Sequence, residues 1–220
     1  AYEKVVERLL ASPAYGERQA RAWLDVAGYA DSSGFSEADS LRFWAFRYRD
    51  RVVKVFNDDV PWDRFIQEQL AGDVEPGSRL PEQLAGDELA GVTHETATEA
   101  VPDDARRAAL EATAFLRLGP DGTGDPVPDQ NLARNQAIAD QIKITSSALL
   151  GLTVACAQCH DHRHDPISQV DYYRFRALFE PAWDWQQWRA PGARTCSLYT
   201  PEERAAAAEI EKAAASIDAE

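Results

Sequence analysis

Apolar residues recur every three or four positions along most of the chain, which is the spacing of one face of an α-helix. This spacing predicts helices over residues 2–11, 14–29, 41–56, 61–72, 104–118, 131–150 and 171–179. A box formed by Thr200 and Glu203, with Pro201 as the first helical residue, predicts one more helix that runs to Glu220. Alternating apolar and polar runs, which would indicate strands, do not occur. We therefore predict an all-α fold of about eight helices around one core.

The segments between these helices differ in their regularity. Residues 31–39 and 119–129 are polar, glycine-containing loops, and residues 73–103 offer only one short helical stretch, 81–89. Residues 181–199 contain three tryptophans but little periodicity. We predict a helical domain over residues 1–185, an irregular Trp-containing segment over 186–199, and a C-terminal helix or connector over 200–220.

Composition narrows the functional classes. Hydrophobic residues make up 45% of the 220 residues, which is enough for a packed core. The net charge of −14 argues against a protein that binds nucleic acid through its phosphates. No apolar run reaches the roughly 18 residues needed to span a bilayer, so we predict no membrane span in this chain.

The segment Cys156-Ala157-Gln158-Cys159-His160 is a C-x-x-C-H motif, the attachment signature of c-type haem. Two thiols three residues apart can add to the two vinyl groups of one haem. The histidine that follows then lies beneath the iron and donates a ring nitrogen. The motif therefore predicts one haem c, bonded to Cys156 and Cys159, with His160 as the proximal axial ligand.

Two other interpretations of the same cysteines compete with haem. In the first, Cys156 and Cys159 bind zinc with two of His160, His162 and His164, although structural zinc usually takes a second ligand pair from a distant segment. In the second, the cysteines form a thioredoxin-type redox pair, which normally sits in a βαβ unit. Cys196 remains outside the motif and is most simply a free thiol.

The sequence leaves several candidates for the ligand on the opposite side of the iron. The chain contains no methionine, which excludes His/Met ligation by its own residues. On a continuous helix His164 would share a face with His160 and could not reach the far side, and His162 would point away. His94 is distant in sequence and is a candidate distal ligand. An iron with five ligands or with water is equally consistent.

The predicted helix over residues 41–56 interleaves arginines with aromatic residues. Trp44, Arg47 and Tyr48 could contact haem propionates as part of the haem surroundings. We favour a structural interpretation, in which the stems pack on the core and the charges stay in water. His162 and Asp165, directly after the motif, are further candidates for the surroundings of the haem.

Several blocks of the chain resemble a family of planctomycete cytochrome c-associated domains of unknown function. The resemblance rests on LGLTVACAQCHDHRHDPISQVDYYRFRALF, ending at Phe179, and on residues 22–35, 44–73 and 113–120, and it covers most of residues 1–185. It implies Cys156, Cys159 and His160 as the haem-attachment set, with His162 and Asp165 as recurrent neighbours. The family usually has an aromatic residue in place of His164, and the stretch around His94 looks like an insertion.

The resemblance also implies a setting in large secreted multi-domain proteins. We therefore expect a periplasmic or otherwise extracytoplasmic domain that transfers electrons to a redox partner protein or a neighbouring cytochrome domain. A haem enzyme or gas-binding module with an open distal site is the first alternative. A structural or binding module held together by haem or zinc is the second. The sequence does not decide whether the domain is an enzyme.

Overall fold

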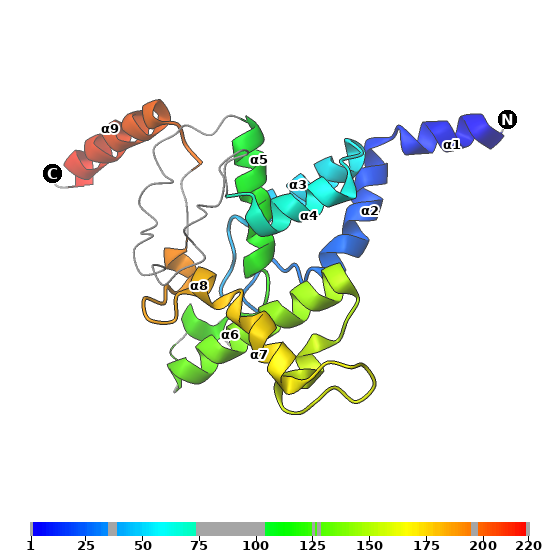
Figure 1. Cartoon of the computed structure of the whole chain (residues 1–220). Helices are drawn as coiled ribbons and strands as arrows, with labels where there is room; N and C mark the ends of the chain where they lie inside the picture. The colour runs from blue at the N-terminus through cyan, green and yellow to red at the C-terminus, as the bar shows by residue number, and fades with distance from the viewer. Residues whose placement is uncertain are drawn as a thin grey trace, which may run out of the picture.

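The fold is all-α, as the periodicity predicted, in a computed structural model that describes residues 2–34, 39–73, 104–124, 126, 129–194 and 198–218 (Figure 1). Within these ranges the chain forms helices and short helical turns and no β-strand, apart from a single bridge between Ser32 and Leu41. None of the described helices is both long and apolar enough to cross a membrane. His94, Cys196 and the short helix expected over residues 81–89 lie outside the described residues.

Four helices form the first part of the domain: α1 (Tyr2–Leu10), α2 (Pro13–Val26), α3 (Ala45–Asn57) and α4 (Trp62–Ala71). The start of α2 follows from its sequence, because the Ser12 side chain accepts a hydrogen bond from the Ala14 N–H and Pro13 supplies a preset backbone angle. Gly16 lets α2 approach α3 closely. A Cβ there would lie 2.5 Å from the Asn57 side chain and from the Val53 carbonyl oxygen.

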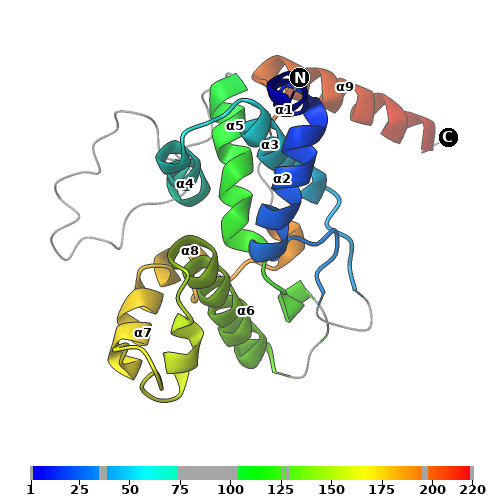
Figure 2. The same ribbon diagram turned by 90° about the vertical axis from the view of Figure 1, so that its right-hand side faces the viewer.

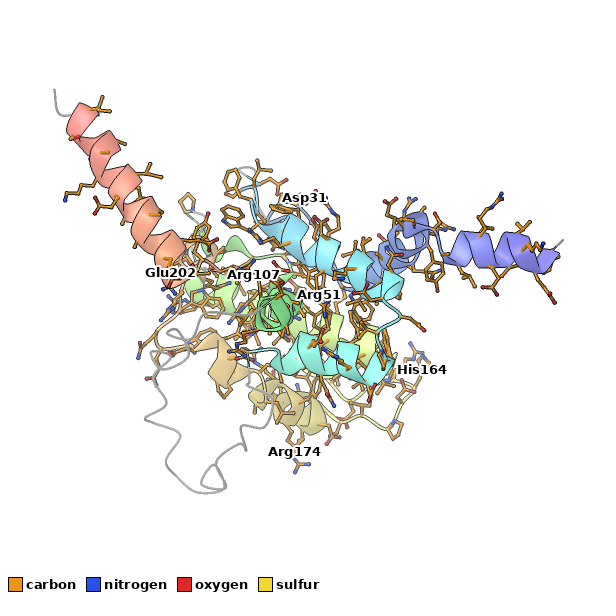
Figure 3. All side chains as sticks on the ribbon, turned by 90° about the horizontal axis from the view of Figure 1, so that it is seen from above. Asp31, Arg51, Arg107, His164, Arg174 and Glu202 are labelled. Carbon is orange, nitrogen blue, oxygen red and sulfur yellow. The ribbon has the colours of Figure 1, made fainter. Side chains whose placement is uncertain are left out.

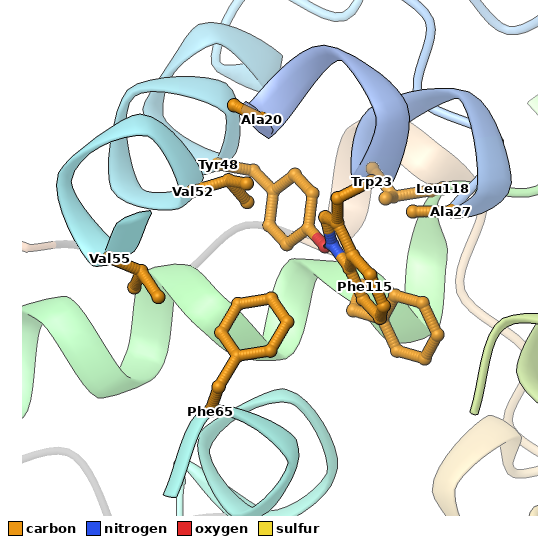
Figure 4. Close-up of a cluster of buried hydrophobic side chains, with 9 residues drawn as sticks. All are labelled: Ala20, Trp23, Ala27, Tyr48, Val52, Val55, Phe65, Phe115 and Leu118. Carbon is orange, nitrogen blue, oxygen red and sulfur yellow. The ribbon is translucent and has the colours of Figure 1, made fainter. Parts of the chain in front are cut away.

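The first core cluster is built around four aromatic side chains from these helices and the turn after α5 (Figure 4). Its members are Ala20, Trp23, Ala27, Tyr48, Val52, Val55, Phe65, Phe115 and Leu118. Trp23 Nε1 donates to the Tyr48 hydroxyl at 2.8 Å, and that hydroxyl donates to Gln69 Oε1 at 2.7 Å. The polar atoms that these rings bring into the core are therefore paired rather than left unsatisfied.

The second part of the domain begins after α5 (Asp104–Ala112), which continues as a 3-10 turn over Thr113–Arg117. It contains α6 (Gln130–Thr145), α7 (Gln169–Ala177) and α8 (Glu180–Trp183). These three helices lie together beside the α2–α5 group (Figure 2). Their second core cluster consists of Ala137, Ile138, Ile142, Val154, Ala157, Tyr172 and Trp183.

The last helix, α9 (Pro201–Asp218), begins at the box that the sequence predicted. Thr200 N–H donates to Glu203 Oε2 at 2.8 Å, and Glu203 N–H donates to Thr200 Oγ1 at 3.1 Å. In Figure 1, α1 and α9 project from the body in opposite directions. Their apolar residues are exposed, with Leu9 at 58% and Ile210 at 71%.

Most of the expected helices differ by one to three residues at an end, and three differ more. The helix expected from Leu41 begins at Ala45, because Leu41 forms the bridge to Ser32 and Arg42 donates to the carbonyls of Leu118 and Gly119 at 2.7 and 2.6 Å. The helix expected over 104–118 tightens into its 3-10 turn. The helix expected over 131–150 widens into a π turn at Ser146–Leu150 and ends at Gly151.

Candidate functional site

The first cysteine of the motif lies on a short 3-10 turn, Val154–Gln158, and the second, Cys159, directly follows it, so neither lies on a continuation of the preceding helix. With about three residues per turn, positions 154 and 157 share one face of such a turn, and positions 156 and 159 share another. Val154 and Ala157 are buried in the second core cluster, whereas Cys156 and Cys159 are exposed free thiols. The fold therefore anchors one face of the turn and presents both sulfur atoms to solvent.

His160 follows the second thiol, and its ring has a defined protonation pattern. Its Nδ1 lies 2.7 Å from the Asp161 carbonyl oxygen. A carbonyl can only accept a hydrogen bond, so Nδ1 carries the proton and the neutral ring has its lone pair on Nε2. Metal-ligating histidines commonly donate their second nitrogen to a carbonyl in this way. His160 is thus prepared to offer Nε2 to a metal.

His162 has the opposite arrangement, with both ring nitrogens engaged by the protein. Its Nε2 lies 2.8 Å from Thr153 Oγ1, and its Nδ1 accepts the backbone N–H groups of Asp165 at 2.8 Å and His164 at 3.3 Å. Only 6% of its side chain is exposed. His162 therefore links the residue before the motif to the loop after it, and neither nitrogen is free for a metal.

These contacts correct the expectation of a continuous helix around the motif. Residues 159–168 form a loop, in which His162 N–H donates to the Ile167 carbonyl at 2.8 Å. Pro166 has no N–H to continue a helical ladder, and the His162 ring takes the N–H groups that a helix would use. The argument from helical spacing therefore does not apply to His160, His162 and His164.

The loop is fastened to α7 by three hydrogen bonds. Asp161 Oδ1 accepts the Gln169 N–H at 2.8 Å, and Gln169 Nε2 donates to the Gln158 carbonyl at 3.0 Å. The same carbonyl accepts the Tyr173 hydroxyl at 3.3 Å. A capping box between Ser168 and Asp171 fixes the start of α7. Nothing in the spacing of the motif pointed to Thr153, Gln169 or Tyr173, because their role depends on how the loop folds back.

Exposed apolar side chains flank the motif on both sides in the sequence. Leu150 and Leu152 precede it with 55% and 38% exposure, and Val170 and Tyr173 of α7 follow it with 56% and 51%. Tyr173 also contacts the motif directly through Gln158. A large flat apolar group attached to the cysteines could bury such side chains, and burial of exposed apolar area is favourable.

Tyr172 approaches the motif from the buried side. Burial raises the pKa of its hydroxyl, Arg176 lowers it, and the nearby Cys159 raises it slightly. The hydroxyl is buried and its proton has no acceptor among the residues that the structure describes. The donor set, and a hydroxyl whose proton has no acceptor in the described residues, fit a covalently attached haem, which brings an iron for Nε2 and polar substituents for a donor.

The same geometry gives no support to zinc. Across the described ranges, no three His, Cys, Asp or Glu side chains come close enough together to hold one metal ion. His162, one of the ligands that a zinc site would draw on, has both nitrogens in use. A haem needs only one protein nitrogen here, because its own ring supplies four ligands.

The arginine and aromatic residues at the start of α3 lie on the side of the first core cluster, and of them Tyr48 is a member of that cluster. Burial raises the pKa of the Tyr48 hydroxyl. Arg47 pairs with Glu111 of α5 at 3.1 Å, and Trp44 is 60% exposed beside it. The structure thus groups Trp44, Arg47 and Tyr48 with α5, whereas His162 and Asp165 lie in the loop that follows the motif.

Comparisons with known proteins give one match. A family model described as PSCyt2, protein of unknown function (DUF1549), matches residues 1–183. The match is consistent with the resemblance seen in the sequence blocks. No curated protein and no solved structure matches the chain.

Proposed function

We propose that this chain, which belongs to the PSCyt2 family, is a c-type cytochrome domain that carries one covalently attached haem. The family's description states no function, so the proposal rests on the site. The observation that carries it is the His160 ring: Nδ1 is committed to the Asp161 carbonyl at 2.7 Å and Nε2 is left as a ligand. The two thiols precede this ring at haem-attachment spacing.

Each residue of the motif has a separate task in this proposal. The thiols of Cys156 and Cys159 each add S–H across one vinyl C=C bond, so that two thioether bonds form and nothing is released. His160 donates Nε2 to the iron while Asp161 holds its ring. When bound, the haem supplies one-electron chemistry that no side chain of this site provides.

The surroundings of the motif would set the conditions for that chemistry. Leu150, Leu152, Val170 and Tyr173 would cover part of the haem edge and exclude water, which shifts the reduction potential. Covalent haem attachment is carried out outside the cytoplasm, so we propose a periplasmic or other extracytoplasmic domain. Its electrons would pass to a redox partner protein or to a cytochrome domain of the same larger protein.

Haem staining after denaturing electrophoresis tests whether haem is covalently attached to the chain. The chain is expressed together with cytochrome-maturation machinery, and the proposal predicts a stained band that survives denaturation. We expect the C156S/C159S double variant to lose the stain. C196S removes the thiol outside the motif, and we expect it to keep the stain. An unstained wild-type band, next to a stained control cytochrome matured in the same cells, would overturn the proposal.

A second candidate, an open distal site that binds a small ligand, is favoured by His162. Its two ring nitrogens are engaged, and the sequence has no methionine, which removes two common sources of a sixth ligand. Absorption spectra of the ferric and ferrous protein separate the candidates. Low-spin iron in both states supports an electron carrier, whereas high-spin iron that readily takes carbon monoxide supports the open site.

A further inference from the structure

A cavity of about 500 Å³ lies between α3, α5 and the start of α9, in the part of the molecule that holds the first core cluster. This volume is within the range of small-molecule sites in proteins. Its walls are formed by Trp44, Arg47, Tyr48, Arg107, Leu110, Glu111, Ala114, Arg194, Leu198, Tyr199 and Glu203. Arg107 and His164 are well apart in Figure 3, so the cavity is separate from the loop that follows the cysteine motif.

Trp44 gives this cavity a flat apolar wall. The side chain is 60% exposed, although it lies at the beginning of a helix whose next turn enters the core. The Arg47 guanidinium lies 5.7 Å from the centre of its ring and is held there by Glu111. The Trp44 ring is therefore held in place while much of its surface is uncovered by the described residues, which is the arrangement of a stacking platform.

The charged groups of the cavity wall are mostly paired with one another. Arg47 is neutralised by Glu111, and Arg194 forms an ion pair with the buried Asp121. Glu203 accepts the Thr200 N–H at the start of α9. Arg107 is the remaining arginine of the cavity wall.

Arg107 makes one weak ion pair in the described part of the chain. The carboxylate recorded beside it, that of Asp104, is fully exposed and lies 4.0 Å from Arg107 Nη1. Arg107 Nε is buried and has no hydrogen-bond partner in the described part of the chain. The Arg107 side chain is 34% exposed, so an anion can reach the guanidinium and accept charge-assisted hydrogen bonds from it.

Arg194 of the cavity wall and two arginines near it in space add to the positive potential of the cavity. Arg42, Arg117 and Arg194 surround a single carboxylate, that of Asp121. Burial, followed by repulsion from Arg194, lowers the pKa of Arg117 to about 10, against the attraction of Asp121. The chain as a whole carries a net charge of −14. This region is therefore a local exception that attracts negative charge.

We propose that this cavity binds a small organic anion with a flat apolar ring, which stacks on Trp44 while its acid group accepts hydrogen bonds from Arg107. This class of ligand matches both the exposed Trp44 ring and the Arg107 guanidinium. A carboxylate or sulfonate matches the guanidinium, and a ring matches the exposed indole. The site does not depend on haem attachment, so it can be tested whether or not the chain carries a haem.

Isothermal titration calorimetry with 8-anilino-1-naphthalenesulfonate, a monoanion with a flat naphthalene ring system, tests the site. Heat is read directly, so the signal does not depend on a haem that would quench fluorescence. We expect one site per chain, and R107Q to weaken binding by roughly tenfold, the effect of losing one charge-assisted contact. W44A is expected to weaken it by roughly fivefold. The neutral analogue N-phenyl-1-naphthylamine is expected to bind wild type and R107Q equally.

Two matched controls separate the cavity from general effects. R49Q removes the same charge from an exposed arginine on α3 that pairs with Asp50, and W185A removes another partly exposed tryptophan. Both are expected to bind the probe like wild type. Equal weakening by R107Q and R49Q, equal weakening by W44A and W185A, or no binding by wild type would each overturn the proposal. R107K, which keeps charge and helix propensity, is expected to bind more tightly than R107Q.

Discussion

His160 and His162 stand two residues apart, but their ring nitrogens have different partners. His160 gives only Nδ1 to the protein, through the Asp161 carbonyl, and keeps Nε2. His162 gives both nitrogens, to Thr153 Oγ1 and to the Asp165 and His164 N–H groups. One histidine can therefore act as a ligand while the other shapes the loop. The motif spacing predicts His160 as a ligand from the sequence alone, but the role of His162 depends on backbone groups that only the folded loop brings to it.

His162→Ala is predicted to lower the free energy of unfolding by about 0.5–1.5 kcal/mol, because the Asp165 and His164 N–H groups lose the ring nitrogen that ties the loop together. Urea denaturation measures the change. His164→Ala is the matched control, since its side chain is exposed in the same loop, and it is expected to leave stability unchanged. Equal losses in the two variants would contradict the role assigned to His162.

Tyr29 leads to a prediction about pH. Burial, and then the hydrogen bond that its hydroxyl donates to Asp31 at 2.6 Å, raise its pKa to about 12 from an ordinary value of 10.0. The folded state thus holds this proton more tightly than the unfolded state. The stabilisation is present in full below pH 10 and is lost as the pH rises through about 12.

Paired urea titrations of wild type and Tyr29→Phe test this sign. The stability difference between the two proteins is expected to be constant at neutral pH. Above pH 10 wild type should lose stability relative to Tyr29→Phe. A difference that stays flat up to pH 12 would show that Tyr29 is not perturbed in the fold.

At the scale of elements, Gly151 separates the helix before the motif from the turn that carries it. Its φ of 65° is left-handed, and the π turn that precedes it ends there. Periodicity predicted the helix over residues 131–150 but not its widening, since a π turn leaves the apolar spacing almost unchanged. The 3-10 turn was also not predictable, because five residues are too few to distinguish a period of three from one of 3.6.

Gly151→Ala is predicted to cost about 1–2 kcal/mol of stability, because a Cβ is strained in the left-handed region. Nothing lies within 4 Å of the new Cβ, so the cost is one of conformation and not of collision. Gly192→Ala is the matched control, with equally open space and no positive φ. Thermal unfolding compares the two, and a Gly192→Ala loss as large as that of Gly151→Ala would refute the explanation.

At the scale of the molecule, two separate core clusters hold different groups of helices together. The first packs α2, α3 and α4 on the turn after α5, and the second packs the motif turn on α6, α7 and α8. Helical periodicity predicted that these segments are helical but not which helices would pair. For that reason Trp44, Arg47 and Tyr48 could be considered for the haem surroundings, although the fold groups them with α5.

Because the motif packs in the second cluster, a substitution in the first cluster is predicted to leave the absorption spectrum of the proposed haem unchanged. Tyr48→Phe removes the hydroxyl that pairs Trp23 with Gln69 and should cost about 1–3 kcal/mol of stability, because both partners remain buried. The ferric and ferrous absorption bands should match those of wild type. A shifted band in a folded Tyr48→Phe protein would mean that α3 does reach the haem.

The intact mass of the chain, matured with cytochrome-assembly machinery and measured under denaturing conditions, tests the central claim most directly. Because two thiols add across two double bonds and nothing is released, we predict the mass of the polypeptide plus one haem. C156S/C159S should have the mass of its polypeptide alone, and C196S should still carry one haem. A wild-type mass without haem, from cells that mature a control cytochrome, would contradict covalent attachment at Cys156 and Cys159.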